Sequence, residues 1–120
     1  MIITLPWPVP QLFPNFKRAH HWRKYRNHER DARALGWGLA METIPPVMRQ
    51  AIAQSDDPIS MTVTFIPPDR RKRDDDGCIG AFKNFRDGIA DALGADDRRF
   101  RPHYEIVAPE KPGRIEVAFS

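Results

Sequence analysis

Cysteine is nearly absent from this sequence, which contains Cys78 and no other. One thiol per chain excludes an intramolecular disulfide framework, and it excludes a zinc site built from several thiolates of one chain. This cysteine usage fits a reducing compartment, so we expect a cytoplasmic protein. Cys78 stands at the start of a helical pattern, where we expect it to pack as a small apolar residue rather than act as a nucleophile.

Long apolar runs are also lacking. No stretch approaches the roughly 20 residues that a membrane-spanning helix needs. Residues 1–10 contain three prolines and no basic residue, unlike a secretory signal peptide. We therefore expect no membrane partner. Internal repeats, linkers and low-complexity stretches are missing too.

The apolar content that is present suffices for one core. The chain has 120 residues, of which 41% are hydrophobic. This length is too short for two ordinary domains. We expect residues 1–120 to form a single small domain.

Hydrophobic periodicity predicts four strands and three helices. The clearest strand covers residues 59–65, where apolar and polar side chains alternate. Other strands are predicted at 2–5, 103–107 and 114–119, and helices at 27–43 (with Asn27 as N-cap), 46–54 and 77–93. Residues 6–25 read as an irregular, proline-rich and basic segment. The order β-α-α-β-α-β-β indicates the α+β class, with a mixed four-stranded sheet on which the helices pack.

Two acidic clusters stand out, Asp74-Asp75-Asp76 and Asp96-Asp97. Two carboxylates about 4 Å apart repel by roughly 1 kcal/mol in water and roughly 4 kcal/mol near a protein surface. If folding gathers them, a cation or protonation must relieve the repulsion. Oxygen ligands suit Mg²⁺, with Mn²⁺ as a substitute, better than zinc. The clusters therefore indicate metal-assisted phosphate chemistry.

Basic residues adjoin both acidic clusters. The formal charge is only +3, but positive residues concentrate in short runs. Two runs flank the acidic clusters directly: Arg70-Arg71-Lys72-Arg73 and Arg98-Arg99 with Arg101. This layout is expected of a nuclease, in which cations hold a polyanion and acids hold a metal. The alternative is that the cations merely balance neighbouring acids on a solvated face.

A lysine lies on the polar side of the predicted helix 77–93. At 100° per residue, Asp76, Gly80, Lys83 and Asp87 share one stripe. Lys83 could contact a scissile phosphate, orient water or neutralise developing charge. Alternatively it forms a surface ion pair with Asp87, worth about 0.3–0.5 kcal/mol.

These motifs together resemble the RusA family of Holliday junction resolvases, which phages and prophages often carry. The shared features are a basic run, Asp-x-Asp, a helix bearing lysine, and a paired aspartate. They are found here in Pro68-Asp69-Arg70-Arg71-Lys72-Arg73-Asp74-Asp75-Asp76, Lys83, Asp87 and Ala92-Leu93-Gly94-Ala95-Asp96-Asp97. The opening Ile3-Thr4-Leu5-Pro6-Trp7-Pro8 also resembles the first strand and proline turn of that family. The resemblance covers most of the chain.

The resemblance implies a RusA-like fold and a Mg²⁺-dependent endodeoxyribonuclease that cuts four-way DNA junctions as a homodimer, in recombination and repair. Carried over by motif, Asp74, Asp76 and Asp97 are the catalytic carboxylates and Lys83 is the candidate catalytic lysine. Asp96 would assist, so the implied metal ligands are Asp74, Asp76, Asp96 and Asp97. Asp75, as the middle residue of the motif, would point elsewhere.

The chain departs from the family pattern in three places. Gly77 stands where asparagine is usual, and Gly80 where the family lysine lies, with Lys83 one turn later. Asn15 with Lys17 or Arg18 is an approximate match to an N-terminal DNA-contact motif. The expected DNA contacts are Asn15, Lys17, Arg18, Arg70, Arg71, Lys72, Arg73, Arg98, Arg99 and Arg101.

Two rival functions remain open: a non-catalytic DNA-binding module with the same fold, and a nuclease with relaxed preference for branched DNA. Aromatic residues also interleave with the basic residues of the N-terminal segment. Trp7, Phe13, Phe16 and Trp22 could stack on exposed bases or pack in the core. His20 and His21 favour phosphate contact or solvation over metal binding.

Overall fold

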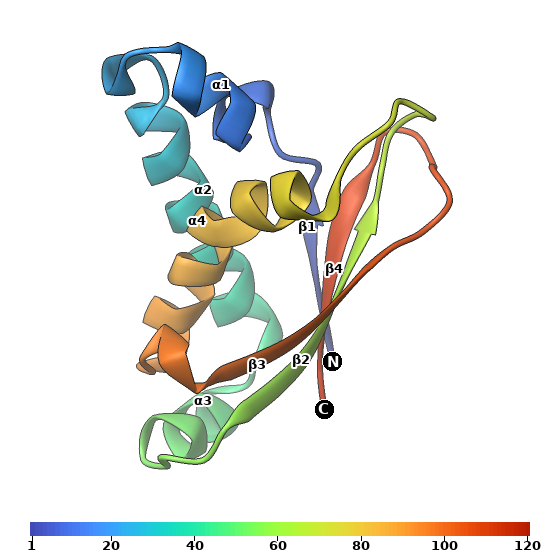
Figure 1. Cartoon of the computed structure of the whole chain (residues 1–120). Helices are drawn as coiled ribbons and strands as arrows, with labels where there is room; N and C mark the ends of the chain where they lie inside the picture. The colour runs from blue at the N-terminus through green and yellow to red at the C-terminus, as the bar shows by residue number, and fades with distance from the viewer.

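A computed structural model describes all 120 residues of the chain. It is a small α+β domain in which helices lie on one side of a mixed four-stranded sheet (Figure 1). The strand order is β1-β4-β2-β3. β2 pairs in parallel with β3, and the other two pairings are antiparallel. None of the helices combines the length and the apolar character needed to cross a membrane.

The strands are β1 (Ile2–Pro6), β2 (Ile59–Ile66), β3 (Phe100–Ile106) and β4 (Arg114–Phe119). The helices are α1 (Pro14–Ala19), α2 (Arg26–Thr43), α3 (Pro46–Ala53) and α4 (Asp75–Leu93). Three short 3₁₀ turns complete the chain: η1 (Pro10–Leu12), η2 (Trp22–Lys24) and η3 (Asp97–Arg99). Because α4 joins the parallel strands β2 and β3, these elements form a β-α-β unit.

The alternating pattern of β2 places one of its faces in the core. Met61, Val63 and Phe65 are almost fully buried, whereas Ser60, Thr62 and Thr64 face the uncovered side. The buried side meets the apolar stripe of α4, where Phe82 and Ile89 are fully buried. The predicted burial of this strand and this helix is confirmed.

α2 and α4 approach each other backbone to backbone. A Cβ added to Gly88 of α4 would overlap the carbonyl oxygen of Arg33 and lie 2.8 Å from the backbone nitrogen of Trp37. A Cβ on Gly36 of α2 would overlap the carbonyl oxygen of Phe85. By contrast, nothing lies within 4 Å of a Cβ on Gly38. The helix-weakening glycine at 36 is therefore required by packing, and the one at 38 is not.

Residues 6–25 are more regular than predicted. They contain η1, α1 and η2, and both η1 and α1 begin with a proline, Pro10 and Pro14. Proline is favoured at a first helical position because its missing N–H would have no helical partner there. Two prolines of a segment that was expected to be irregular thus start short helices.

Two predicted boundaries were wrong. α2 begins at Arg26 without a side-chain cap, so Asn27 is not its N-cap. β3 begins at Phe100 rather than 103, and it includes Pro102. β3 lies at the edge of the sheet, where a strand can accept a proline that donates no hydrogen bond. A purely local rule could not reveal that edge position.

Candidate functional site

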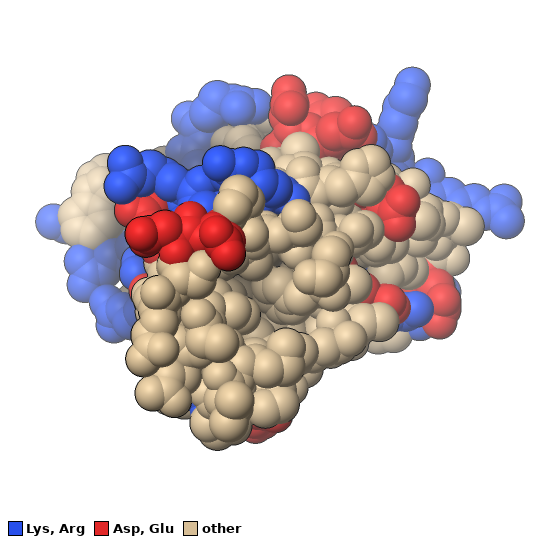
Figure 2. All heavy atoms as spheres, turned by 90° about the horizontal axis from the view of Figure 1, so that it is seen from below, with Lys and Arg blue, Asp and Glu red and all other residues tan.

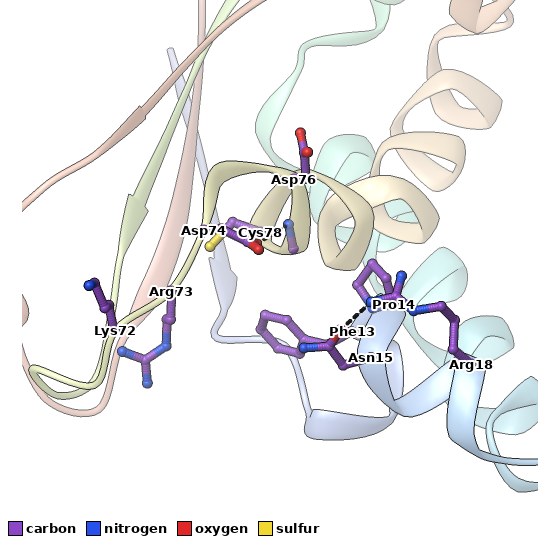
Figure 3. Close-up of a pocket in the computed structure, with 10 residues that line it drawn as sticks. Phe13, Pro14, Asn15, Arg18, Lys72, Arg73, Asp74, Asp76 and Cys78 are labelled. Carbon is purple, nitrogen blue, oxygen red and sulfur yellow. Dashed lines mark hydrogen bonds between the residues drawn. The ribbon is translucent and has the colours of Figure 1, made fainter.

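A cavity of about 330 Å³ opens where the start of α4 faces α1 and the loop after β2 (Figure 3). Predicted site residues from two separate segments of the chain line it: Asn15 and Arg18 from the first, and Lys72, Arg73, Asp74 and Asp76 from the second. The other lining residues are Phe13, Pro14, Gly77 and Cys78. Folding therefore brings Asp74 and Asp76 together with predicted DNA contacts from the N-terminal segment and from the basic run at 70–73.

Asp74 is positioned by the start of α4. It is the N-cap residue, and its Oδ1 accepts a hydrogen bond of 2.7 Å from the backbone N–H of Gly77. Such a cap satisfies a helix N–H that would otherwise lack a partner. Asp74 is thus held in place by the helix that it caps. Figure 3 shows its carboxylate turned toward the cavity.

Asp76 and Asp75 take different directions from the first turn of α4. Asp76 lines the cavity, although its exposed carboxylate points outward in Figure 3. Sharing a cation with Asp74 therefore requires a rotation of the Asp76 side chain, which its exposure permits. Asp75 is exposed and lines a different, small hollow together with Ile79, Tyr104 and Glu105. The expectation that Asp75 points elsewhere is met.

The basic residues at the cavity differ in how firmly they are held. The Arg73 side chain is only 14% exposed; it bonds Asp69 at 2.8 Å and lies 5.3 Å from the centre of the Trp7 ring. The backbone N–H of Arg71 and the Arg73 guanidinium keep the pKa of Asp69 below its usual value. Arg70, Arg71 and Lys72 are exposed. Arg73 therefore braces the loop, and Arg70, Arg71 and Lys72 are the cations that face solvent.

Two predicted contacts of the N-terminal segment reach the cavity, and one does not. Arg18 donates a hydrogen bond to the Asn15 amide oxygen at the cavity wall. Lys17 turns away and pairs with Glu29 at 2.6 Å. The structure thus places Asn15 and Arg18, rather than Lys17, beside the carboxylates.

The second acidic cluster lies at the other end of α4. This helix has 19 residues, a length of about 28 Å. Asp97 pairs with Arg86 at 3.4 Å, and Arg86 is about 15 Å beyond Asp76 along the helix axis. Mg²⁺ binds its ligands at about 2 Å. The expectation that Asp74, Asp76, Asp96 and Asp97 converge within one chain is therefore wrong, and no three acidic, His or Cys side chains of the chain gather closely enough to hold a metal ion.

Asp96 and the adjoining basic run form their own charged surface. Asp96 accepts hydrogen bonds from the Arg98 backbone N–H and guanidinium, and these lower the pKa of its carboxyl group. Arg99 is bound to the carbonyl oxygens of Ile52 and Asp57. Arg101 bonds the carbonyl oxygen of Arg98. Figure 2 looks at the end of the molecule where α3 lies, and shows acidic and basic side chains side by side at its edge.

Lys83 does not reach the cavity. Its ammonium group is exposed and pairs with Asp87 at 3.0 Å. At Gly80, the position of the family lysine, a Cβ would lie 2.6 Å from the Pro14 ring. Pro14 therefore fills the space into which a side chain at position 80 would grow. Within one chain, Lys83 has the geometry of the surface ion pair.

No protein-family model matches the sequence. An "Uncharacterized protein" of Xylella fastidiosa (strain Temecula1) is 38% identical over 110 residues. The similarity covers 84% of this chain and 63% of that protein, so this chain spans less than two thirds of its relative. The name of this relative states no activity.

Several cavity residues were missed from the sequence. Phe13 and Pro14 line the cavity because α1 lies over the start of α4 (Figure 1). Residues 6–25 were expected to be irregular, so α1 and its position were not predicted. Arg86, which lies outside the cavity and pairs with Asp97, was missed as well. Cys78 is buried at the cavity wall, and this burial raises the pKa of its thiol. A buried thiol that stays protonated agrees with the expected packing role.

Proposed function

We propose that this protein is a Mg²⁺-dependent endodeoxyribonuclease that acts as a homodimer on four-way DNA junctions. The observation that carries the proposal is the cavity shared by Asp74, Asp76, Asn15, Arg18 and Lys72. It combines carboxylates, which suit a hard cation, with groups that bind phosphate. Two parts of the RusA-like motif, the end of the basic run and the Asp-x-Asp carboxylates, line this cavity, whereas Lys83 and Asp97 lie away from it.

Each side chain has a defined task in this proposal. Asp74 and Asp76 would hold Mg²⁺, which supplies an activated water and polarises the phosphate when bound. Arg18 and Lys72 would hold the DNA backbone across the cavity. Asn15 donates or accepts hydrogen bonds beside them and fixes Arg18. The ion pair of Arg73 with Asp69 would hold the loop that carries Lys72 close to the start of α4.

Asp97 can join the same metal only from a second protomer. The length of α4 separates it from Asp74 and Asp76 of its own chain. In a two-fold dimer the same surface is used twice, so each cavity could receive Asp97 from the partner. Two such sites related by the axis would nick two strands symmetrically, which suits a four-way junction. Arg98 and Arg101 of each protomer would then lie near the DNA of the other site.

The function is tested with the wild-type protein, a synthetic four-way junction and a linear duplex of equal length. We expect paired nicks in the junction with Mg²⁺ or Mn²⁺, none with a chelator, and a clear preference for the junction in competition. Comparable cleavage of the linear duplex would favour the nuclease with relaxed preference. No cleavage with either metal over a range of salt concentrations would refute the enzyme.

A shared site between protomers predicts that two inactive variants complement each other. We expect Asp76→Asn and Asp97→Asn to be inactive alone and to regain activity when co-expressed. In the mixed dimer, one site carries both substitutions and the other carries neither. Random pairing then restores about a quarter of the wild-type sites. If all ligands came from one chain, every site would stay defective and the mixture would remain inactive.

A second function, DNA binding without catalysis, is favoured by one observation. Gly80 offers no room for the family lysine, and Lys83 is paired with Asp87. This alternative predicts junction binding without a Mg²⁺ site. Calorimetric titration with Mg²⁺ separates the two functions. The enzyme should show a heat of Mg²⁺ binding that disappears in Asp76→Asn, whereas the non-catalytic module should show none.

A further inference from the structure

An exposed cluster of aromatic and basic side chains lies next to the cavity, in residues 16–26. The rings of Phe16 and His20 stack with their centres 3.8 Å apart. Trp22 follows in η2 and is 45% exposed. The guanidinium groups of Arg23 and Arg26 lie 5.7 Å and 5.1 Å from the Trp22 ring centre. Two cations therefore surround an indole that the core does not use.

Other aromatic residues of the N-terminal segment have a structural role, and Trp22 does not. Trp7 and Phe13 pack against the hydrophobic core. Trp22 is not among the residues that pack against the core, and its aromatic neighbour is His21, whose ring is tilted against it. The guanidinium groups beside it form no ion pair or hydrogen bond with the rest of the chain. Packing alone thus leaves this cluster unexplained.

The surroundings of Trp22 match one kind of partner. Residues 14–30 contain six arginine and lysine residues and only one carboxylate, Glu29. Lys17 already neutralises that carboxylate. A polyanion is attracted to such a surface, and a flat exposed indole adds a stacking platform for a base. Every base of a paired duplex has both faces covered, so only unpaired nucleotides can use the ring.

We propose that Trp22, with Arg23 and Arg26, is a stacking site for an unpaired nucleotide of DNA. The inference rests on the proposed function for its substrate, because a branch point exposes unpaired bases. Arg18 lines the cavity and precedes Trp22 by four residues in the chain. A strand held at Trp22 could thus continue past Arg18 toward Asp74. The site would splay one strand of the junction before it is cut.

The test measures binding of a deoxythymidine oligonucleotide of about twelve nucleotides to the full chain in the presence of a chelator. We expect the oligonucleotide to quench tryptophan fluorescence of the wild type. Trp22→Ala should weaken binding about 5- to 150-fold, and Trp22→Phe should stay within about threefold of the wild type because it keeps a stacking ring. Binding of a blunt duplex should change little in either variant.

Trp37 provides the matched control, because it is 47% exposed and lies on α2 outside this cluster. Trp37→Ala should bind the oligonucleotide like the wild type. Equal binding by Trp22→Ala and the wild type, equal losses in the two alanine variants, or no binding by the wild type would each overturn the proposal. Since no metal is present, the binding results do not depend on cleavage. If the protein proved not to be a nuclease, binding of the oligonucleotide through Trp22 would still stand.

Discussion

Asp76→Asn is expected to lower the rate of junction cleavage in Mg²⁺ by at least about 1,000-fold, while metal-free binding of the junction stays within about threefold. Asparagine keeps the size of the side chain and one oxygen, but it removes the negative charge that a metal ion requires. A 1,000-fold loss corresponds to about 4 kcal/mol of transition-state stabilisation, which is the scale of metal catalysis. Single-turnover cleavage and a binding titration in chelator measure the two quantities separately.

The matched control for this variant is Asp75→Asn. It removes the same charge from the same turn of α4, but Asp75 lies in the hollow beside Ile79 rather than at the cavity. We expect its cleavage rate to stay within about threefold of the wild type. If the two variants lost activity equally, the effect would arise from the charge of the helix start and not from a ligand at the cavity, and Asp76 would lose its assigned role.

Gly88→Ala is expected to destabilise the fold by about 3 kcal/mol and to lower the melting temperature by about 10 °C. The added Cβ would overlap the carbonyl oxygen of Arg33, which belongs to the backbone of α2 and cannot rotate away. The helices must then separate, and the apolar residues between them lose contact. Thermal unfolding followed by circular dichroism measures the change.

Gly38→Ala is the control for this substitution. It makes the same chemical change in a helix, but nothing lies within 4 Å of the new atom. Alanine is the better helix former, so we expect a gain of about 0.5–1 kcal/mol. A loss of stability in Gly38→Ala as large as that in Gly88→Ala would contradict the packing argument. The two sites would then respond alike, although only Gly88 lies against the backbone of another helix.

Local patterns predicted most elements of the fold because they depend on neighbours in the sequence. The strand predicted from the alternation of residues 59–65 and the helix predicted from the apolar stripe of 77–93 are both confirmed. Gly94 ends α4 in the left-handed conformation that glycine adopts readily. The errors fell where tertiary context decides. The strand predicted at 103–107 begins at Phe100 instead, and it can include Pro102 because β3 is an edge strand. The short helix α1 lies over the start of α4, a contact that its own residues do not encode.

For the candidate site, the order of residues along the chain was enough to predict the available chemistry: two acidic clusters, the basic runs beside them, and their positions before and after one long helix. Which of these groups meet depends on how the helices and loops pack. Asp74, Asp76, Arg18 and Lys72 share a cavity because α1 and the loop after β2 converge on the start of α4. Asp97 is kept apart from them by the rigid length of that helix. Spacing along a chain gives the separation of residues in sequence, and a helix converts that separation into a fixed distance in space.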